Sequence, residues 1–173
     1  GILFLEEIPL WGFDRDQLAQ DIVLDRAVAM LWGMVSRDIN HPSIWAWSVL
    51  NECATNSPEG RTMVEQLTDT VRELDPTRPV TFASNHALTD TCFDLVDVVC
   101  VNAYHGWYTH DTGWGRFLDR VRQRIGSKPL IVSEFGAGAI PGYRTGDEGV
   151  VWSEEYQRDL LARCLDLFLD RQD

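Results

Sequence analysis

One stretch of the chain, residues 44–50, restricts the fold more than any other. Its side chains, IWAWSVL, are large and apolar at nearly every position, so both faces of the strand that they form must be covered. Such a strand is typical of a parallel sheet in an α/β protein, because helices cover both sides of that sheet. Asn51 and Glu52 follow directly. Since α/β proteins bind ligands at the carboxyl ends of their strands, Glu52 is a candidate catalytic residue.

Strand-like and helical segments alternate along the whole chain. The predicted strands are residues 2–5, 44–50, 80–83, 96–102 and 130–133. The predicted helices are residues 14–38, a segment from Pro58 that ends before Pro76, residues 114–125, and a segment capped by Ser153 that runs through Leu169. Hairpin signals and the GxGxxG and GxxxxGK[ST] fingerprints are missing from the sequence, which indicates a parallel sheet without a dinucleotide or phosphate loop.

A second glutamate at a strand end favours a barrel over an open sheet. Glu134 follows residues 130–133 as Glu52 follows residues 44–50, and these two strands are three apart in order. In an eight-stranded barrel such positions face each other across the mouth, whereas in an open sheet they diverge. We therefore predict a partial (β/α)8 TIM barrel of about five βα units, strands 3 to 7, filling residues 1–173. A full barrel takes roughly 250 residues, so we expect the other strands, and the true start of the protein, outside this sequence.

Composition limits the partners that the chain is expected to have. Asp and Glu number 27 against 15 Lys and Arg, and the net charge of −12 argues against nucleic acid or an anionic membrane as a partner. No apolar run approaches the roughly 20 residues of a membrane span, and no signal peptide is visible, so a cytoplasmic location is the expectation. The widely spaced cysteines contain no CxxC pair and are interpreted as reduced thiols. They are Cys53, Cys92, Cys100 and Cys164.

Two carboxylates beside aromatic side chains indicate glycoside hydrolysis. One carboxylic acid would protonate the leaving oxygen while the other, ionised, attacks the anomeric carbon. Residues 103–108, AYHGWY, supply rings on which sugars can stack, although an aromatic cluster is more often packing. A metal-dependent hydrolase that uses His41 and His86 is an alternative, but neither HxH nor HExxH spacing supports it. A noncatalytic carbohydrate-binding protein on a barrel scaffold is a further alternative.

Several blocks of the sequence resemble glycoside hydrolase family 2. Residues 37–52, RDINHPSIWAWSVLNE, are similar to the segment with the Asn-Glu acid/base pair of that family, and residues 132–140, VSEFGAGAI, to its nucleophile segment. Four more blocks match in the same order: GILFLEEIPLWG, LDPTRPVTFASN, VNAYHGWY and WSEEYQ. Ordered matches over nearly the whole chain are far more specific than any one motif. The chain is thereby identified as part of the catalytic TIM barrel of this family.

The resemblance implies a mechanism and assigns roles to residues. It implies a retaining β-glycosidase that works by double displacement, with Glu52 as the acid/base, Asn51 beside it, and Glu134 as the nucleophile. It also places three further residues at the sugar site or in support of the nucleophile, namely Asn102, Tyr104 and Tyr108.

The same resemblance suggests a substrate. The blocks look most like those of members that hydrolyse β-glucuronides, while β-galactosides or other family substrates are the alternative. Such members usually carry Arg and Tyr where this chain has Ala103 and His105, and Cys53 replaces a small residue or proline. The Asn-x-Lys element that recognises glucuronate is not in these 173 residues. We expect a carbohydrate partner, no cofactor, no metal, a parent protein able to form a homo-oligomer, and no activity from these residues alone.

Overall fold

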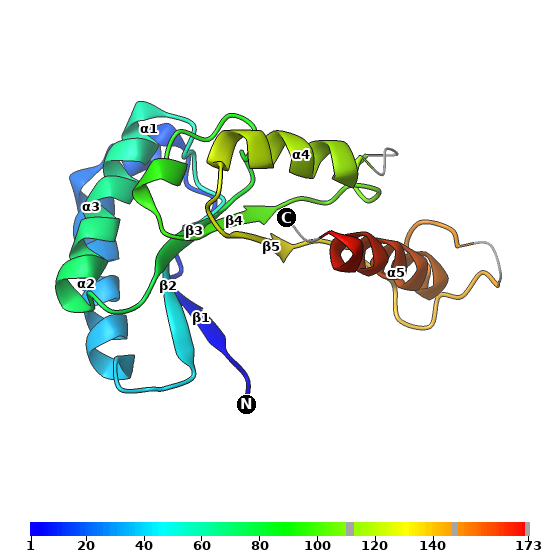
Figure 1. Ribbon diagram of the computed structural model, residues 1–173, viewed down its shortest axis with the longest axis horizontal. Helices are drawn as coiled ribbons and strands as arrows, with labels where there is room; N and C mark the ends of the chain where they lie inside the picture. The colour runs from blue at the N-terminus through cyan, green and yellow to red at the C-terminus, as the bar shows by residue number, and fades with distance from the viewer. Residues whose placement is uncertain (110–112, 147–148, 172–173) are drawn as a thin grey trace. The chain divides into compact units, whose positions relative to one another are not determined.

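The computed structural model describes residues 1–109, 113–146 and 149–171. The strands are β1 (Phe4–Glu7), β2 (Ile44–Asn51), β3 (Val80–Ser84), β4 (Val99–Asn102) and β5 (Leu130–Glu134). The helices are α1 (Arg15–Leu18), α2 (Asp21–Asp38), α3 (Pro58–Leu74), the 3-10 turn η1 (Phe93–Leu95), α4 (Trp114–Ile125) and α5 (Glu154–Asp170). Within these described ranges, the strands form one sheet in chain order, and β1–β2, β2–β3 and β3–β4 pair in parallel (Figure 1).

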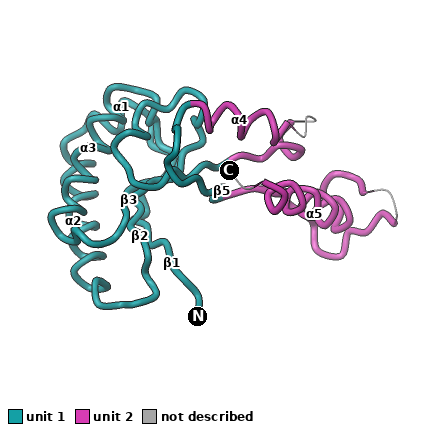
Figure 2. The backbone as a smooth tube through the Cα atoms, viewed as in Figure 1, with its two compact units in different colours: residues 1–102, 124–133 teal, residues 103–123, 134–173 magenta. Residues whose placement is uncertain are grey.

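The chain divides into two compact units, which Figure 2 colours separately. Unit 1 comprises residues 1–102 and 124–133, and unit 2 comprises residues 103–123 and 134–173. Unit 1 therefore contains β1 to β4, α1 to α3 and most of β5, while unit 2 contains most of α4 and all of α5. The candidate residue Glu52 belongs to unit 1, and Glu134 belongs to unit 2.

The core of unit 1 is built around β2. Trp47, Val49 and Leu50 are fully buried, as residues 44–50 predicted. Helix α3 packs on β2 and β3 with its apolar stripe, and α2 lies beside α3 (Figure 1). A Cβ at Gly60 would lie 2.1 Å from the carbonyl oxygen of Ala54, so glycine allows α3 to start close against the loop that follows Glu52.

Three predicted elements differ from the observed ones. The single helix predicted for residues 14–38 is two helices, because Asp14 and Gln17 form a capping box around α1 and Gln20 is extended at φ −89° and ψ 123°. The strand predicted for residues 96–102 begins at Val99, because the carboxylate of Asp97 accepts the Val80 N–H at 2.9 Å ahead of the ladder. The first strand is Phe4–Glu7 rather than residues 2–5.

Part of the predicted aromatic cluster packs against other aromatic rings of unit 2. The ring centroid of His105 lies 5.0 Å from that of Trp114 and 4.9 Å from that of Phe117. Trp114 in turn meets Phe168 of α5 edge-on at 4.9 Å. His105 is therefore a packing residue, as is usual for a member of an aromatic cluster.

The predicted cap of α5 is confirmed, because the Ser153 hydroxyl accepts the Tyr156 N–H at 3.1 Å.

The cysteines and the helices agree with the predictions from composition. All four cysteines are free and buried. Burial raises the pKa of Cys53 to about 11 and that of Cys92 to about 12. Within the described parts of the chain, every helix is too short or too polar to cross a membrane.

Candidate functional site

Glu52 lies directly after β2 in an unusual backbone conformation. Its φ of 53° falls in the left-handed region, which residues other than glycine seldom adopt. Hydrogen bonds hold the backbone on both sides of this position: the Glu52 N–H donates to the Ala83 carbonyl at 2.8 Å, and the Ala54 N–H donates to the Phe13 carbonyl at 2.9 Å. The glutamate is therefore positioned by its neighbours and not by local propensity.

A buried amide from β4 orients the side chain of Glu52. The Nδ2 of Asn102 donates to Oε1 of Glu52 and to Oδ1 of Asn51, each at 3.0 Å. The Oδ1 of Asn102 accepts a hydrogen bond from the Ser133 hydroxyl at 2.6 Å, which fixes the orientation of the amide. Asn102 is 4% exposed, so the arrangement belongs to the interior of unit 1. The structure thus brings three of the sequence-predicted residues together.

Trp11 also contacts Glu52, and sequence reasoning missed it. Its indole Nε1 donates a long hydrogen bond, 3.4 Å, to Oε2 of Glu52. Trp11 forms an isolated parallel bridge with Asn51, so its backbone runs beside the end of β2. The available signal was its place in the block GILFLEEIPLWG, an aromatic residue just beyond a predicted strand.

The remaining predicted site residues meet in unit 2. The hydroxyl of Tyr104 donates a hydrogen bond to Oε2 of Glu134, and the Ala103 N–H donates to the Glu134 carbonyl at 3.1 Å. The ring of Tyr108 packs edge-on against that of Tyr104, with centroids 5.1 Å apart, and Tyr108 is 75% exposed. Tyr104 therefore positions Glu134 directly, and Tyr108 supports the ring of Tyr104.

A buried carboxylate connects the loop after Glu52 to the loop after β3. Asp90 is 2% exposed and accepts hydrogen bonds from the hydroxyls of Thr55 and Ser84, the latter at 2.6 Å, and from the Cys92 N–H at 2.8 Å. Burial raises the pKa of Asp90 above its usual range, although these three donors act in the opposite direction. Because Thr55 is three residues after Glu52, Asp90 tethers the loop that carries the candidate acid/base.

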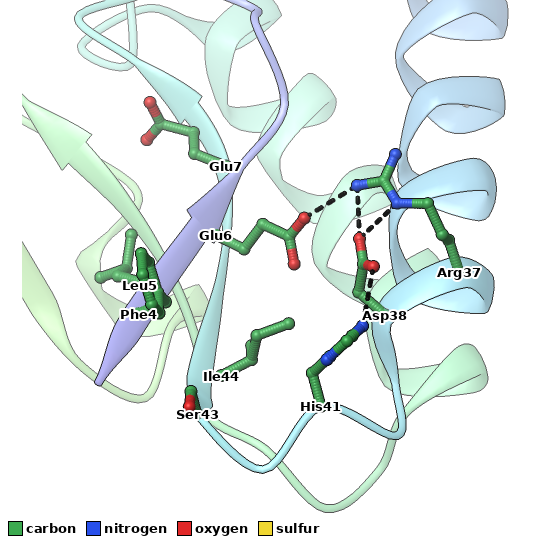
Figure 3. A pocket seen from close by; sticks show the side chains of 9 residues that line it. All are labelled: Phe4, Leu5, Glu6, Glu7, Arg37, Asp38, His41, Ser43 and Ile44. Atoms are coloured by element: carbon green, nitrogen blue, oxygen red, sulfur yellow. Dashed lines mark hydrogen bonds and ion pairs between the residues drawn. The ribbon is translucent and has the colours of Figure 1, made fainter. Parts of the chain in front are cut away.

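A separate charged pocket lies at the start of β2 and contains none of the predicted site residues (Figure 3). Its volume is about 490 Å³. The charged or titratable side chains that line it are Glu6, Glu7, Arg37, Asp38 and His41. Arg37 bonds both Glu6, at 3.1 Å, and Asp38. Burial, and then the Asp38 carboxyl, raise the pKa of Glu6. The Nε2 of His41 lies 3.7 Å from Oδ1 of Asp38.

The alternative chemistry, metal-dependent hydrolysis, needs a group of metal ligands. Among residues 1–109, 113–146 and 149–171, no three His, Cys, Asp or Glu side chains come together in a way that could hold a metal ion. His86 lies beyond β3, where its N–H donates to the Ser84 hydroxyl at 3.0 Å.

The fold and the positions of the glutamates define the class of protein. A parallel sheet in chain order, with helical connections and a glutamate at the ends of β2 and β5, is a segment of a (β/α)8 barrel with acidic groups at its carboxyl ends. The family model for glycosyl hydrolases family 2, TIM barrel domain, matches residues 13–173. The chain belongs to glycoside hydrolase family 2, which confirms the predicted family and the partial barrel.

Known relatives cover the whole chain. It is 37% identical to a β-glucuronidase of Paenibacillus borealis, over 100% of this chain and 31% of the relative, and 34% identical to that of Homo sapiens, over 94% and 26%. Among solved structures, a β-galacturonidase of Eisenbergiella tayi bound to galacturonate aligns with a TM-score of 0.93 at 36% identity, covering 99% of this chain and 32% of that one. The chain thus spans between about a quarter and a third of the length of these relatives.

Proposed function

We propose that this chain is the part of a retaining β-glycosidase that carries both catalytic carboxyl groups. Glu52 is the general acid and base, and Glu134 is the nucleophile. The observation that carries the proposal is that each glutamate follows a strand of the barrel and accepts a hydrogen bond from a residue at or just after the end of β4, Asn102 for Glu52 and Tyr104 for Glu134. Such fixed partners orient carboxyl groups for reaction.

The proposed reaction takes two steps. In the first, Oε1 of Glu134 attacks the anomeric carbon, because Oε2 accepts the Tyr104 hydroxyl. The bond from that carbon to the leaving oxygen breaks, and the leaving oxygen takes the proton of Glu52. In the second step Glu52 removes a proton from water, the water oxygen bonds to the anomeric carbon, and the Glu134 carboxylate departs. Two carboxyl groups suffice for this chemistry, so the proposal includes no cofactor.

We propose β-glucuronides as the substrates. The support is the group of β-glucuronidases among the relatives, at 34% to 37% identity for the two named above. The β-galacturonidase at 36% identity supports β-galacturonides as the second candidate, and the two sugars differ only in configuration at C4. In either case Asn51, Asn102, Tyr104 and Tyr108 are proposed to contact or frame the sugar. Assays of the full-length protein with 4-nitrophenyl β-D-glucuronide and β-D-galacturonide distinguish the candidates.

Azide rescue tests the two roles separately. In Glu52→Ala the acid/base is lost, so azide should replace water in the second step and give the β-glycosyl azide. In Glu134→Ala azide should attack in place of the nucleophile and give the α-azide. We expect each variant without azide to lose at least about 100-fold in kcat/KM.

A matched control and a stereochemical measurement complete the test. Glu65→Ala changes an exposed glutamate on α3 and should leave kcat/KM unchanged. Proton NMR of wild-type hydrolysis should show the β-anomer of the sugar first. An initial α-anomer would overturn the retaining mechanism, and normal turnover by Glu134→Ala would overturn its assignment as nucleophile.

A further inference from the structure

Trp11 is exposed beside Glu52 although its immediate neighbours are buried. Its side chain is 65% exposed, whereas Leu10 is 2% exposed and Ile8 is also 2% exposed. The two reaction steps proposed above use Glu52 and do not use this ring.

The backbone around Trp11 is fixed to the end of β2. The Asn51 N–H donates to the Leu10 carbonyl at 2.9 Å, and the Gly12 N–H donates to the Asn51 carbonyl at 3.0 Å. Gly12 adopts a φ of 72°, a left-handed conformation that suits glycine and lets the chain turn back towards Asn51. The ring is therefore held near Glu52 by main-chain bonds, and a ligand can cover it without a rearrangement of the backbone.

We propose that Trp11 forms the leaving-group subsite and selects glycosides with a planar aromatic aglycone. This inference rests on the proposed function, in which Glu52 protonates the leaving oxygen. That oxygen is bonded directly to the aglycone, so the aglycone must lie within reach of the Glu52 carboxyl when the proton moves. The Nε1 of Trp11 lies 3.4 Å from Oε2 of the same carboxyl. A flat ring therefore finds an aromatic face beside the group that protonates its oxygen.

The two reaction steps provide a specific signature for this role. The aglycone is present until the first step ends and has departed before the second begins. The face of the Trp11 ring should therefore affect kcat/KM, which reports binding and the first step, and not the hydrolysis rate of the glycosyl-enzyme. The Nε1 hydrogen bond acts on the carboxyl group that both steps use, so Trp11→Phe, which lacks that bond and keeps a ring, isolates the contribution of the face. A ring that merely stabilised the fold near Glu52 would change both steps and all substrates together.

The experiment compares two β-D-glucuronides, 4-nitrophenyl and methyl, in the full-length protein. Trp11→Ala should lower kcat/KM for the 4-nitrophenyl substrate about tenfold and for the methyl substrate less than about twofold. Trp11→Phe keeps a ring but not the N–H and should retain most of the selectivity for the aromatic aglycone. Turnover of a 2-fluoro glycosyl-enzyme by water should be equal in Trp11→Phe and Trp11→Ala, since both lack the Nε1 hydrogen bond to Glu52. Trp32→Ala, which removes another tryptophan of unit 1 that is 56% exposed, is the control and should change neither substrate.

The outcomes separate this inference from the function on which it rests. Equal losses for both substrates, no loss for either, or slower turnover of the glycosyl-enzyme in Trp11→Ala than in Trp11→Phe would overturn the leaving-group subsite while the glycosidase assignment stands. Failure of the wild type to hydrolyse any β-glycoside would overturn the proposed function and the subsite with it.

Discussion

Replacing Asp90 with alanine should destabilise the loop that carries Glu52. The carboxylate is 2% exposed, and its partners are two hydroxyls and one amide, from Thr55, Ser84 and Cys92. Alanine offers none of them an acceptor. The Cys92 N–H cannot turn elsewhere, whereas the two hydroxyl groups can rotate towards other acceptors.

The cost follows from counting these donors. A buried N–H without an acceptor costs about 1 to 3 kcal/mol, and each lost hydroxyl bond costs about 1 kcal/mol. Burial raises the pKa of Asp90, which means that its charge opposes folding at neutral pH, so removing the charge offsets part of the loss. We expect Asp90→Ala to lower the local free energy of unfolding by about 3 kcal/mol.

Hydrogen exchange of the full-length protein measures this local stability. The opening free energy of a peptide containing the Cys92 amide should fall by the stated amount at pH 7. Thr55→Val removes a single donor and should cost about 1 kcal/mol. Asp69→Ala, at an exposed position of α3, should change the value by less than about 0.5 kcal/mol. A loss below about 1 kcal/mol in Asp90→Ala would refute the argument that three donors depend on this carboxylate.

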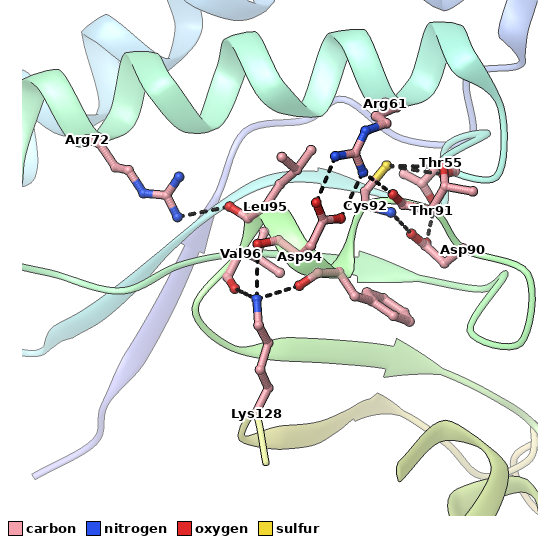
Figure 4. Close-up of polar contacts among 11 residues, drawn as sticks. Thr55, Arg61, Arg72, Asp90, Thr91, Cys92, Asp94, Leu95, Val96 and Lys128 are labelled. Carbon is pink, nitrogen blue, oxygen red and sulfur yellow. Dashed lines mark hydrogen bonds and ion pairs between the residues drawn. The ribbon is translucent and has the colours of Figure 1, made fainter. Parts of the chain in front are cut away.

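Three further changes have defined outcomes. Burial alone would raise the pKa of Asp75, but donors from Trp47 and residues 77–78 hold it below its usual value. The stabilisation that the ionised Asp75 contributes is therefore present above the unfolded pKa near 3.9 and is lost as the pH falls through the lower folded pKa. Plots of the free energy of unfolding against pH should then fall less steeply below pH 4 for Asp75→Asn than for wild type. Lys128 donates hydrogen bonds to three carbonyl oxygens, two in η1 and one in the residue after it (Figure 4). Lys128→Met should therefore lower the free energy of unfolding, measured by hydrogen exchange, by about 2 kcal/mol. An unchanged value would show that water replaces these bonds. Tyr104→Phe should lower kcat at least about tenfold with an unchanged melting temperature, and the reverse pattern would assign Tyr104 to packing.

Apolar runs and strand ends account for what the sequence could predict. Residues 44–50 had no polar face, so their burial on both sides followed from composition alone. Because parallel strands end at the same edge, Asn51 and Asn102 could be expected near each other, and they are 3.0 Å apart between Nδ2 and Oδ1. Local polar contacts account for one difference. The helix predicted for residues 14–38 is divided at Gln20, and the first part, α1, is held by a capping box. The apolar periodicity of residues 14–38 contains no information about that polar contact.

The bonds formed by Asp90 and Trp11 lay beyond sequence reasoning for a different reason. Each depends on the meeting of segments that are far apart in the chain: Asp90 with Thr55, and Trp11 with Glu52. Asp90 stands in none of the sequence blocks quoted above, and Trp11 lies in the block GILFLEEIPLWG without a spacing that marks a contact with Glu52. A single aspartate or tryptophan has many ordinary roles. Only the register of the parallel strands determines which loops become neighbours.

The backbone of Glu52 explains why this loop is tethered so heavily. A left-handed conformation at a residue other than glycine costs on the order of 1 to 3 kcal/mol, and local preference alone would place glycine or asparagine there. Proton transfer requires a carboxyl group, which neither of those residues supplies. The cost must then be met by contacts outside the loop, and the bonds from Glu52 to Ala83, from Ala54 to Phe13 and from Thr55 to Asp90 supply them. Glu52 thus has a backbone conformation that is unfavourable for glutamate, and contacts with three distant segments compensate for it. This combination is expected where function, and not folding, selected the side chain.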